Sequence, residues 1–267
     1  DGERIVTADF EGNVKLWQTA TQQLLQVMRV GAEIPLVLDT AQENLIAVGY
    51  DRGKARLWNA ATGEQIITLY GYGGEVWAID LLPDASAIAF GYPFGDILIY
   101  RLRDMDAHQV SILENLDAGE LNDLAFQPNL QPLPFPGSFV LATVSNFEYA
   151  RFWDIFCFGH PCTYDTSASM AYPSNLTFNH DGSLLVIAGK ETTAGGGCFT
   201  NPCNLEIVDA RYIQDSVNVY PVIATLEGHT DFFEDVTFSP DDRFIASASN
   251  DGVILIWGVH HLIDDDN

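Results

Sequence analysis

The chain repeats one pattern of residue types along its length. The stretch 245–257, "IASASNDGVILIW", can be laid over 5–17, "IVTADFEGNVKLW": two apolar residues, Ser or Thr, an acid-Gly turn, an alternating segment and Trp. A repeat of about 40 residues is typical of arrays in which each copy is one supersecondary unit, so this pattern constrains the fold more than any single segment does. Weaker copies occupy 45–58, 87–100, 140–153 and 184–208.

Each copy is predicted to consist of β-strands. Short segments alternate apolar and polar side chains, and clusters of Gly, Pro, Asn and Asp separate them. The pattern predicts strands near 233–239, 244–249 and 253–258 in the last copy, and linking strands at 65–70 and 221–226. Four-stranded units of this length, arranged radially, form the blades of a β-propeller. The expected blades are 1–30, 31–72, 73–118, 119–172, 173–228 and 229–259, followed by an acidic tail at 260–267.

The last copy also carries a family resemblance. The run 226–258, "LEGHTDFFEDVTFSPDDRFIASASNDGVILIWG", contains a Gly-His pair, a Phe-Ser-Pro-Asp turn, a Ser-x-Ser strand, an Asp-Gly turn and a Trp. In these features the chain resembles the WD40 repeat family, with repeats of the bacterial type, over nearly all of its residues. The resemblance implies an all-β fold in which 1–267 form a single β-propeller domain of four-stranded antiparallel blades.

About six blades are expected within these residues. Because "DGERIVTADF" at 1–10 aligns with "DDRFIASASN" at 241–250, the first blade is expected to lack its innermost strand. We therefore expect the complete protein to be longer at its N-terminus and to have seven blades, with six as the alternative.

The resemblance further implies a buried hydrogen-bond set in the last blade. It joins His229 to Asp251, to the indole of Trp257 and to a strand serine, which is Ser247 or, as the alternative, Ser249. A buried imidazole and a buried indole N–H each need a partner, which gives the set a structural purpose. The same residue types form a catalytic triad in hydrolases, but the sequence has no Gly-x-Ser-x-Gly nucleophile motif. No catalytic residue is predicted, and the chain is expected not to be an enzyme.

The four cysteines form two similar motifs, "CFGHPC" at 157–162 and "CFTNPC" at 198–203. In a propeller of this family the first motif would follow a third strand and the second would precede one, which places them on opposite faces. A shared zinc site needs four sulfurs around one ion, so no metal or cofactor is predicted. Of the three possible pairings we favour Cys157–Cys162 and Cys198–Cys203, with four free thiols as the alternative.

Composition limits the partners. The 267 residues contain 37 acidic and 12 basic side chains, a formal charge of −25, which opposes binding to nucleic acid, and no apolar run is long enough for membrane insertion. Disulfides favour an extracellular, periplasmic or cell-surface location, with the cytoplasm as the alternative. The predicted function is a non-enzymatic interaction scaffold in a larger assembly. The alternatives are a propeller enzyme or metal-dependent hydrolase, and a structural subunit of an extracellular fibre or surface layer.

Several acidic residues fall where the chain enters the innermost strands. In a propeller they would surround one mouth of the central channel, with aromatic side chains beside them. We expect this face to bind protein partners, including a basic segment, because concentrated acidic charge attracts cations and aromatic residues are common at interface centres. The predicted partner-binding residues are Glu33, Glu75, Trp77, Glu120, Asp231, Phe232 and Glu234.

Overall fold

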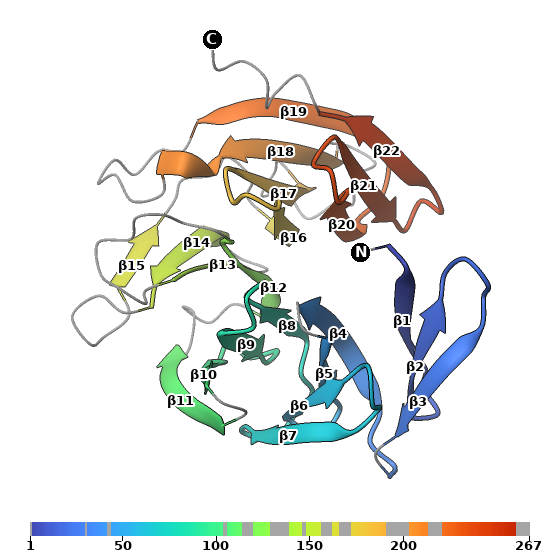
Figure 1. Cartoon of the computed structure of the whole chain (residues 1–267). Helices are drawn as coiled ribbons and strands as arrows, with labels where there is room; N and C mark the ends of the chain where they lie inside the picture. Colours follow the sequence, from blue (N-terminus) through green and yellow to red (C-terminus); the bar gives the residue numbers. More distant parts are fainter. Residues whose placement is uncertain are drawn as a thin grey trace. The chain divides into compact units, whose positions relative to one another are not determined.

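The computed structural model consists of antiparallel β-sheets and divides into two compact units, 1–116 and 117–267. Figure 1 shows the strands with their labels. The described residues are 2–29, 31–41, 44–103, 106–113, 120–128, 139–145, 148–155, 162–165, 172–190, 203–212 and 221–259.

Unit 1 contains three sheets in which strands that follow one another in the chain pair with one another. The first sheet is β1 (Arg4–Ala8), β2 (Asn13–Gln18) and β3 (Leu24–Arg29). The second is β4 (Pro35–Ala41), β5 (Leu45–Tyr50), β6 (Lys54–Asn59) and β7 (Gln65–Tyr70). The third is β8 (Ala78–Leu81), β9 (Ala87–Gly91), β10 (Ile97–Arg103) and β11 (Asp106–Leu113).

Unit 2 contains three sheets of the same kind. The fourth sheet is β12 (Leu121–Phe126), β13 (Val140–Ser145), β14 (Glu148–Asp154) and β15 (Cys162–Asp165). The fifth is β16 (Tyr172–Phe178), β17 (Leu184–Lys190), β18 (Cys203–Asp209), with a short 3₁₀ helix η2 (Ala210–Tyr212) after it, and β19 (Val222–His229). The sixth is β20 (Phe233–Phe238), β21 (Phe244–Ser249) and β22 (Ile254–Gly258).

The described strands therefore form an all-β fold of six antiparallel sheets, as the repeat pattern predicts. The strands expected at 65–70, 244–249 and 253–258 correspond to β7, β21 and β22. The first and sixth sheets contain three described strands each, and the other four contain four.

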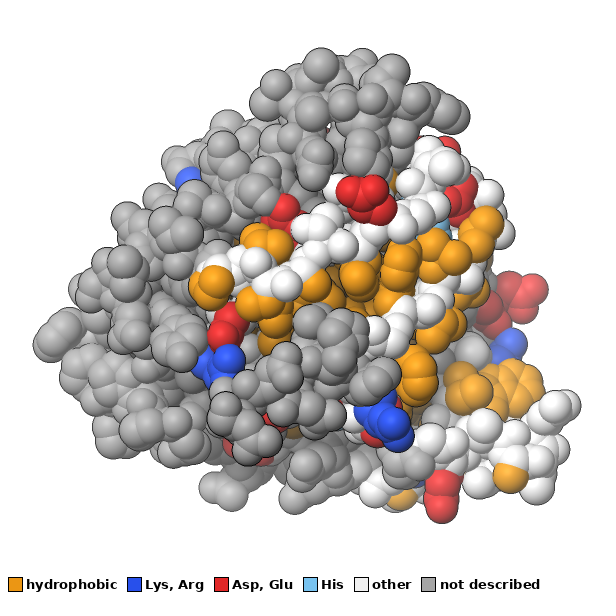
Figure 2. Space-filling model, turned by 90° about the horizontal axis from the view of Figure 1, so that it is seen from above, with side chains coloured by type: hydrophobic (Ala, Val, Ile, Leu, Met, Phe, Trp, Pro, Cys, Tyr) orange, Lys and Arg blue, Asp and Glu red, His pale blue; other side chains and the backbone are white. Residues whose placement is uncertain are grey.

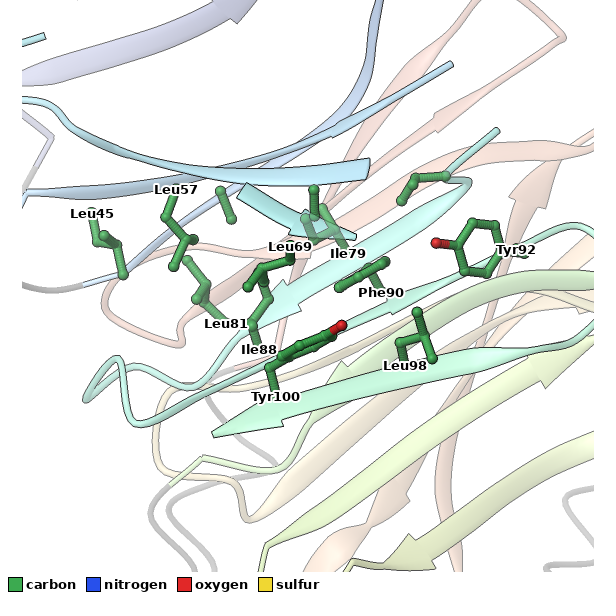
Figure 3. Packing of buried hydrophobic residues seen from close by; sticks show 13 residues of the cluster. Leu45, Leu57, Leu69, Ile79, Leu81, Ile88, Phe90, Tyr92, Leu98 and Tyr100 are labelled. Atoms are coloured by element: carbon green, nitrogen blue, oxygen red, sulfur yellow. The ribbon is translucent and has the colours of Figure 1, made fainter. Parts of the chain in front are cut away.

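Within each unit the first strands of successive sheets lie side by side: β4 beside β8, β12 beside β16, and β16 beside β20. The faces of neighbouring sheets then enclose apolar cores. Figure 3 shows the core between the second and third sheets, where Leu57 and Leu69 lie among side chains of β8–β10. Phe90 and Tyr100 stack there with ring centroids 5.8 Å apart. Burial of both faces explains why β5 and β9 are apolar throughout rather than alternating.

The outer strands leave more apolar surface exposed. From the side of β19 and β22, Figure 2 shows hydrophobic side chains gathered in a band. On β22, Ile254 and Ile256 are 69% and 63% exposed. The alternate residues Leu255 and Trp257 point to the other face, and their side chains are the nearest neighbours of Gly228 on β19. The alternation follows from the two-residue period of a strand.

Candidate functional site

The sixth sheet holds the hydrogen-bond set expected around His229. Its Nδ1 lies 2.9 Å from Asp251 Oδ2 and its Nε2 lies 2.8 Å from Ser247 Oγ. The indole Nε1 of Trp257 donates to the same Ser247 oxygen at 2.9 Å. Of the two serines considered, Ser247 is thus the one in the set, while Ser249 donates to the backbone carbonyl of Asp231.

The protons of this set can be assigned from the state of Asp251. Hydrogen bonds from the backbone N–H of Thr230 and from His229 lower the pKa of Asp251 to about 2. Because this carboxylate only accepts, we assign a proton to Nδ1 of His229. In the neutral imidazole, Nε2 then accepts the hydroxyl proton of Ser247, whose oxygen receives the indole N–H.

This arrangement fits a structural role better than a catalytic one. His229 and Ser247 are 3% and 1% exposed, so a substrate carbonyl cannot approach the serine oxygen. That oxygen is also occupied by the indole of Trp257. A serine nucleophile needs both access and a free trajectory, and neither is present here.

The bond between a tryptophan and a hydroxyl recurs in two other sheets, which the sequence reasoning missed. Trp17 Nε1 donates to Thr7 at 2.9 Å and Trp153 Nε1 donates to Thr143 at 3.0 Å. In each case the hydroxyl residue precedes the tryptophan by ten positions, a spacing that is visible in the sequence.

The second sheet lacks this bond. Trp58 pairs with Ile46 as Trp257 pairs with Ile245, so Val48 stands where Ser247 would be. The buried Nε1 of Trp58 accordingly makes no hydrogen bond of ordinary geometry among the described residues, although its interaction with Tyr50 opposes the rise that burial causes in the pKa of that tyrosine.

Glu33 lies in a buried ion cluster rather than on an open acidic face. It is 8% exposed; Arg56 Nη1 donates to its Oε2, and Lys54 Nζ donates to its Oε1 at 3.0 Å. Burial raises the pKa of this carboxyl, but the hydrogen bonds from Arg56 and Lys54 outweigh burial and the pKa is lowered. The expectation of a solvent-facing Glu33 therefore differs from the structure, because β6 turns two long basic side chains onto it.

Glu75 and Trp77 remain at the surface of unit 1, between β7 and β8. Glu75 is exposed, Trp77 is 38% exposed, and the indole Nε1 donates to Glu75 Oε2 at 3.2 Å. We call these two residues the unit 1 patch.

The remaining predicted partner-binding residues lie in unit 2. Glu120 just before β12 and Glu234 within β20 are exposed, and Phe232 just before β20 is 46% exposed. Asp231 is half-buried, and its Oδ1 accepts a hydrogen bond from the backbone N–H of Phe232 at 2.9 Å. We call Glu120, Asp231, Phe232 and Glu234 the unit 2 patch.

Sequence reasoning also missed a set of aspartates on the first strands. Asp39 Oδ2 accepts a hydrogen bond from the backbone N–H of Leu81 in the next sheet at 2.7 Å. Burial raises the pKa of Asp39. An acid inside an otherwise apolar strand is the sequence signal that would identify such a residue.

Asp123 makes the corresponding link in unit 2. Its Oδ2 accepts from the N–H of Leu176 at 3.0 Å and its Oδ1 from its neighbour Leu124 at 2.8 Å. Burial raises the pKa of Asp123 to about 7, against the effect of these two hydrogen bonds, and the charge of Asp235 raises it further.

Only part of the cysteine prediction falls on described residues. Cys203, at the start of β18, is buried and disulfide-bonded. Cys157 and Cys198, and the side chain of Cys162, lie outside the described residues, so the pairing stays a prediction. Within the described ranges no group of three or more His, Cys, Asp or Glu side chains could hold a metal ion.

The sheets and the hydrogen-bond set define a class of protein, the repeat proteins built from propeller-type blades. A family model described as "WD domain, G-beta repeat" matches residues 221–258, which contain β19–β22 and the His229 set. Residues 221–258 thus match a WD40-type repeat, and over a longer stretch the chain is similar to WD-repeat proteins at low identity. The matched residues are those in which the sequence resemblance is sharpest.

The curated relatives match this chain at low identity, and several are named as WD-repeat proteins. The LST8 homolog of Drosophila melanogaster is 26% identical over 227 residues, 83% of this chain and 61% of that protein. Human WD repeat-containing protein 36 is 22% identical over 208 residues, 75% of this chain and 22% of that protein. Eukaryotic translation initiation factor 3 subunit I of Vanderwaltozyma polyspora is 22% identical over 245 residues, 88% of this chain and 65% of that protein. The chain thus spans less than two thirds of the first two relatives.

A solved structure with the same fold is the crystal structure of the computationally designed Ika8 protein. The TM-score is 0.68 at 16% identity, over 97% of this chain and 69% of that chain. At this identity the likeness concerns the fold alone.

The relatives correct one expectation and leave another without support. The extracellular, periplasmic or cell-surface location is wrong, because a translation initiation factor subunit and the other matched proteins point to the cytoplasm. The cysteine motifs were a poor guide to the compartment, although Cys203 is disulfide-bonded. The matched proteins come from eukaryotes, so nothing supports repeats of a bacterial type.

Proposed function

We propose that this chain is a non-enzymatic protein-interaction module and forms one part of a larger intracellular assembly. The observation that carries the proposal is a division of the polar residues. His229, Ser247 and Glu33 are buried and form hydrogen bonds or ion pairs within the chain. Acidic and aromatic side chains near the start of the first strand of several sheets are exposed instead. One relative is, by its name, a subunit, which agrees with such a role.

The proposed binding regions are the unit 1 patch and the unit 2 patch. Both combine carboxylates with a large aromatic side chain, Trp77 in one and Phe232 in the other. Aromatic anchors supply much of the energy at interface centres, and carboxylates select cationic partners. With a formal charge of −25, the chain favours a basic segment as partner.

Fractionation of a native extract tests the function. We expect the protein to elute in a complex larger than 29.4 kDa, and the purified partner to bind the purified chain with fixed stoichiometry in calorimetry. Elution of the chain as a free monomer from a gentle, low-salt extract would contradict the proposal.

A charge-matched pair of variants tests the surface. Replacing Glu75, Asp231 and Glu234 by their amides should weaken binding of the partner about tenfold at low salt. It should also reduce the dependence of the Kd on salt concentration. The control replaces Glu64, Asp84 and Glu227, which are exposed elsewhere, and changes the net charge equally. If both variants weakened binding equally, only the net charge would matter. The two patches would then not be the binding regions.

A further inference from the structure

Exposed aromatic side chains concentrate in one region of unit 1. Within the described ranges seven aromatic residues are strongly exposed, and four of them lie at the β7–β8 and β9–β10 connections. Isolated exposed apolar residues are ordinary, but a gathered set marks an interaction site. The four are Tyr70 (68% exposed), Tyr72 (49%), Trp77 (38%) and Phe94 (82%). Together with Glu75 they are called here the aromatic loop surface.

A buried tyrosine, Tyr92, packs against the β7–β8 connection. Tyr92 is 4% exposed, and its hydroxyl donates to the carbonyl of Gly53 at 2.8 Å. Burial raises the pKa of Tyr92, so the hydroxyl keeps its proton and remains a donor. The ring centroid of Tyr72 lies 6.4 Å from that of Tyr92.

The backbone is fitted closely around this tyrosine. A Cβ at Gly71 would meet the Tyr92 hydroxyl at 1.5 Å, so only glycine leaves room for it. The N–H of Trp77 donates to the carbonyl of Gly91, next to Tyr92, at 3.0 Å. Tyr72 and Trp77 are thus tied to the backbone and ring around Tyr92, and such contacts lower the entropy lost on binding.

The carboxylate of this surface is held at the edge of an indole. Trp77 Nε1 donates to Glu75 Oε2 at 3.2 Å, which leaves Oε1 and part of the ring open. A guanidinium group matches this pair, because it is planar, stacks on aromatic faces and hydrogen-bonds carboxylates in a fixed fork. An ammonium group is attracted by the same charges but cannot stack as a plane.

We propose that the aromatic loop surface binds an arginine side chain in a flexible basic segment of a partner protein. The guanidinium lies on the Trp77 ring and donates to Glu75, and Tyr72 and Phe94 contact the flanking residues of the segment. This inference rests on the proposed function and names the place and the chemistry of one contact.

The test uses Gly-Ser peptides that carry two arginines, two lysines or two citrullines, titrated into the ¹⁵N-labelled chain. The chain has five tryptophans, whose indole N–H signals report on five separate places, and the Trp77 signal is assigned by its loss in Trp77→Phe. We expect the arginine peptide to shift the Trp77 signal, with a Kd about threefold or more below that of the lysine peptide. The neutral citrulline peptide should leave the signal unmoved.

Matched variants locate the contact. Glu75→Gln should raise the Kd of the arginine peptide about five- to tenfold, because a charge-assisted hydrogen bond is lost. Phe10→Ala removes an exposed aromatic ring from the β1–β2 turn, and Glu64→Gln removes an exposed charge from the β6–β7 turn. Neither substitution should change the Kd. The four other indole signals show whether each variant is folded.

Each outcome decides a different point. No shift of the Trp77 signal, or equal weakening by Glu75→Gln and Glu64→Gln, would overturn the arginine site. If the native complex forms and neither Glu75→Gln nor excess arginine peptide affects it, this inference is wrong while the proposed function stands. If the chain is a monomer in the extract, the proposed function is wrong whatever the peptides do.

Discussion

Asp123 on β12 caps the edge of a strand in the neighbouring sheet, where its Oδ2 accepts a hydrogen bond from the N–H of Leu176 on β16 at 3.0 Å. Asp39 makes the same link to Leu81 on β8. The first strand of each sheet is an edge strand, and its outward N–H groups have no ladder partner. A carboxylate from the preceding sheet satisfies one of them and ties two sheets together.

The first prediction concerns pH. The pKa of Asp123 is raised to about 7 in the folded chain, above its value in the unfolded chain, so the folded state binds the extra proton. The stability that this proton contributes is fully present below about pH 4 and is lost as the pH rises through about 7. We therefore expect Asp123→Asn to reduce the fall in unfolding free energy between pH 4 and pH 7.

Urea unfolding at several pH values measures this effect. One proton difference gives a slope of at most about 1.4 kcal/mol per pH unit. The control Glu64→Gln, at an exposed turn, should leave the slope of unfolding free energy against pH as in the wild type. If Asp123→Asn also left that slope unchanged, Asp123 would be ionised throughout and the prediction would be wrong.

The second prediction concerns the bond between a tryptophan indole and a hydroxyl, which the second sheet lacks. Val48→Thr should place a hydroxyl near the unpaired indole N–H of Trp58, as Thr7 does for Trp17 and Thr143 for Trp153. We expect an increase in the unfolding free energy of about 1 kcal/mol, the usual net value of one hydrogen bond. In the double variant with Trp58→Phe the gain should disappear; a loss of stability from Val48→Thr alone would show that its hydroxyl finds no partner.

The third prediction concerns the His229 set. His229→Ala should lower the unfolding free energy by about 2–3 kcal/mol, because Ser247 and Asp251 each lose a partner. A double-mutant cycle with Ser247→Ala should give a coupling energy of about 1 kcal/mol. Additive effects would mean that the two side chains do not act as one set.

The fourth prediction concerns the buried ion cluster. Glu33→Gln should destabilise the chain by about 2 kcal/mol, because it leaves Arg56 buried without a counter-charge. Glu75→Gln, at an exposed carboxylate, should change thermal stability little. If Glu33→Gln and Glu75→Gln gave the same melting temperature, the cluster would have no net effect on stability.

The fifth prediction concerns the cysteines. Peptide mapping of the unreduced protein should find Cys203 joined to Cys198, and Cys157 joined to Cys162, within their own short motifs. A peptide that links the two motifs would contradict this pairing, and free Cys203 would contradict the bond in the structure.

Much of the fold follows from the sequence by itself. The alternating segments and their turns located strands such as β7, β21 and β22, because a two-residue period and turn residues act locally. The His229 set could be named in advance from the family resemblance, since its residues belong to the repeat in which that resemblance is sharpest.

Other features depended on the tertiary structure. The sequence did not show that Arg56 and Lys54 would cover Glu33, that Asp123 would bond to Leu176, or that Tyr92 would support Tyr72. Each of these contacts joins residues that are distant in the sequence, whose distance in space is set by how the elements pack and not by their order in the chain. The burial that changes the pKa of a carboxyl exists only after that packing, which is why one acid in this chain is an ion-paired structural residue and another is an exposed binding candidate.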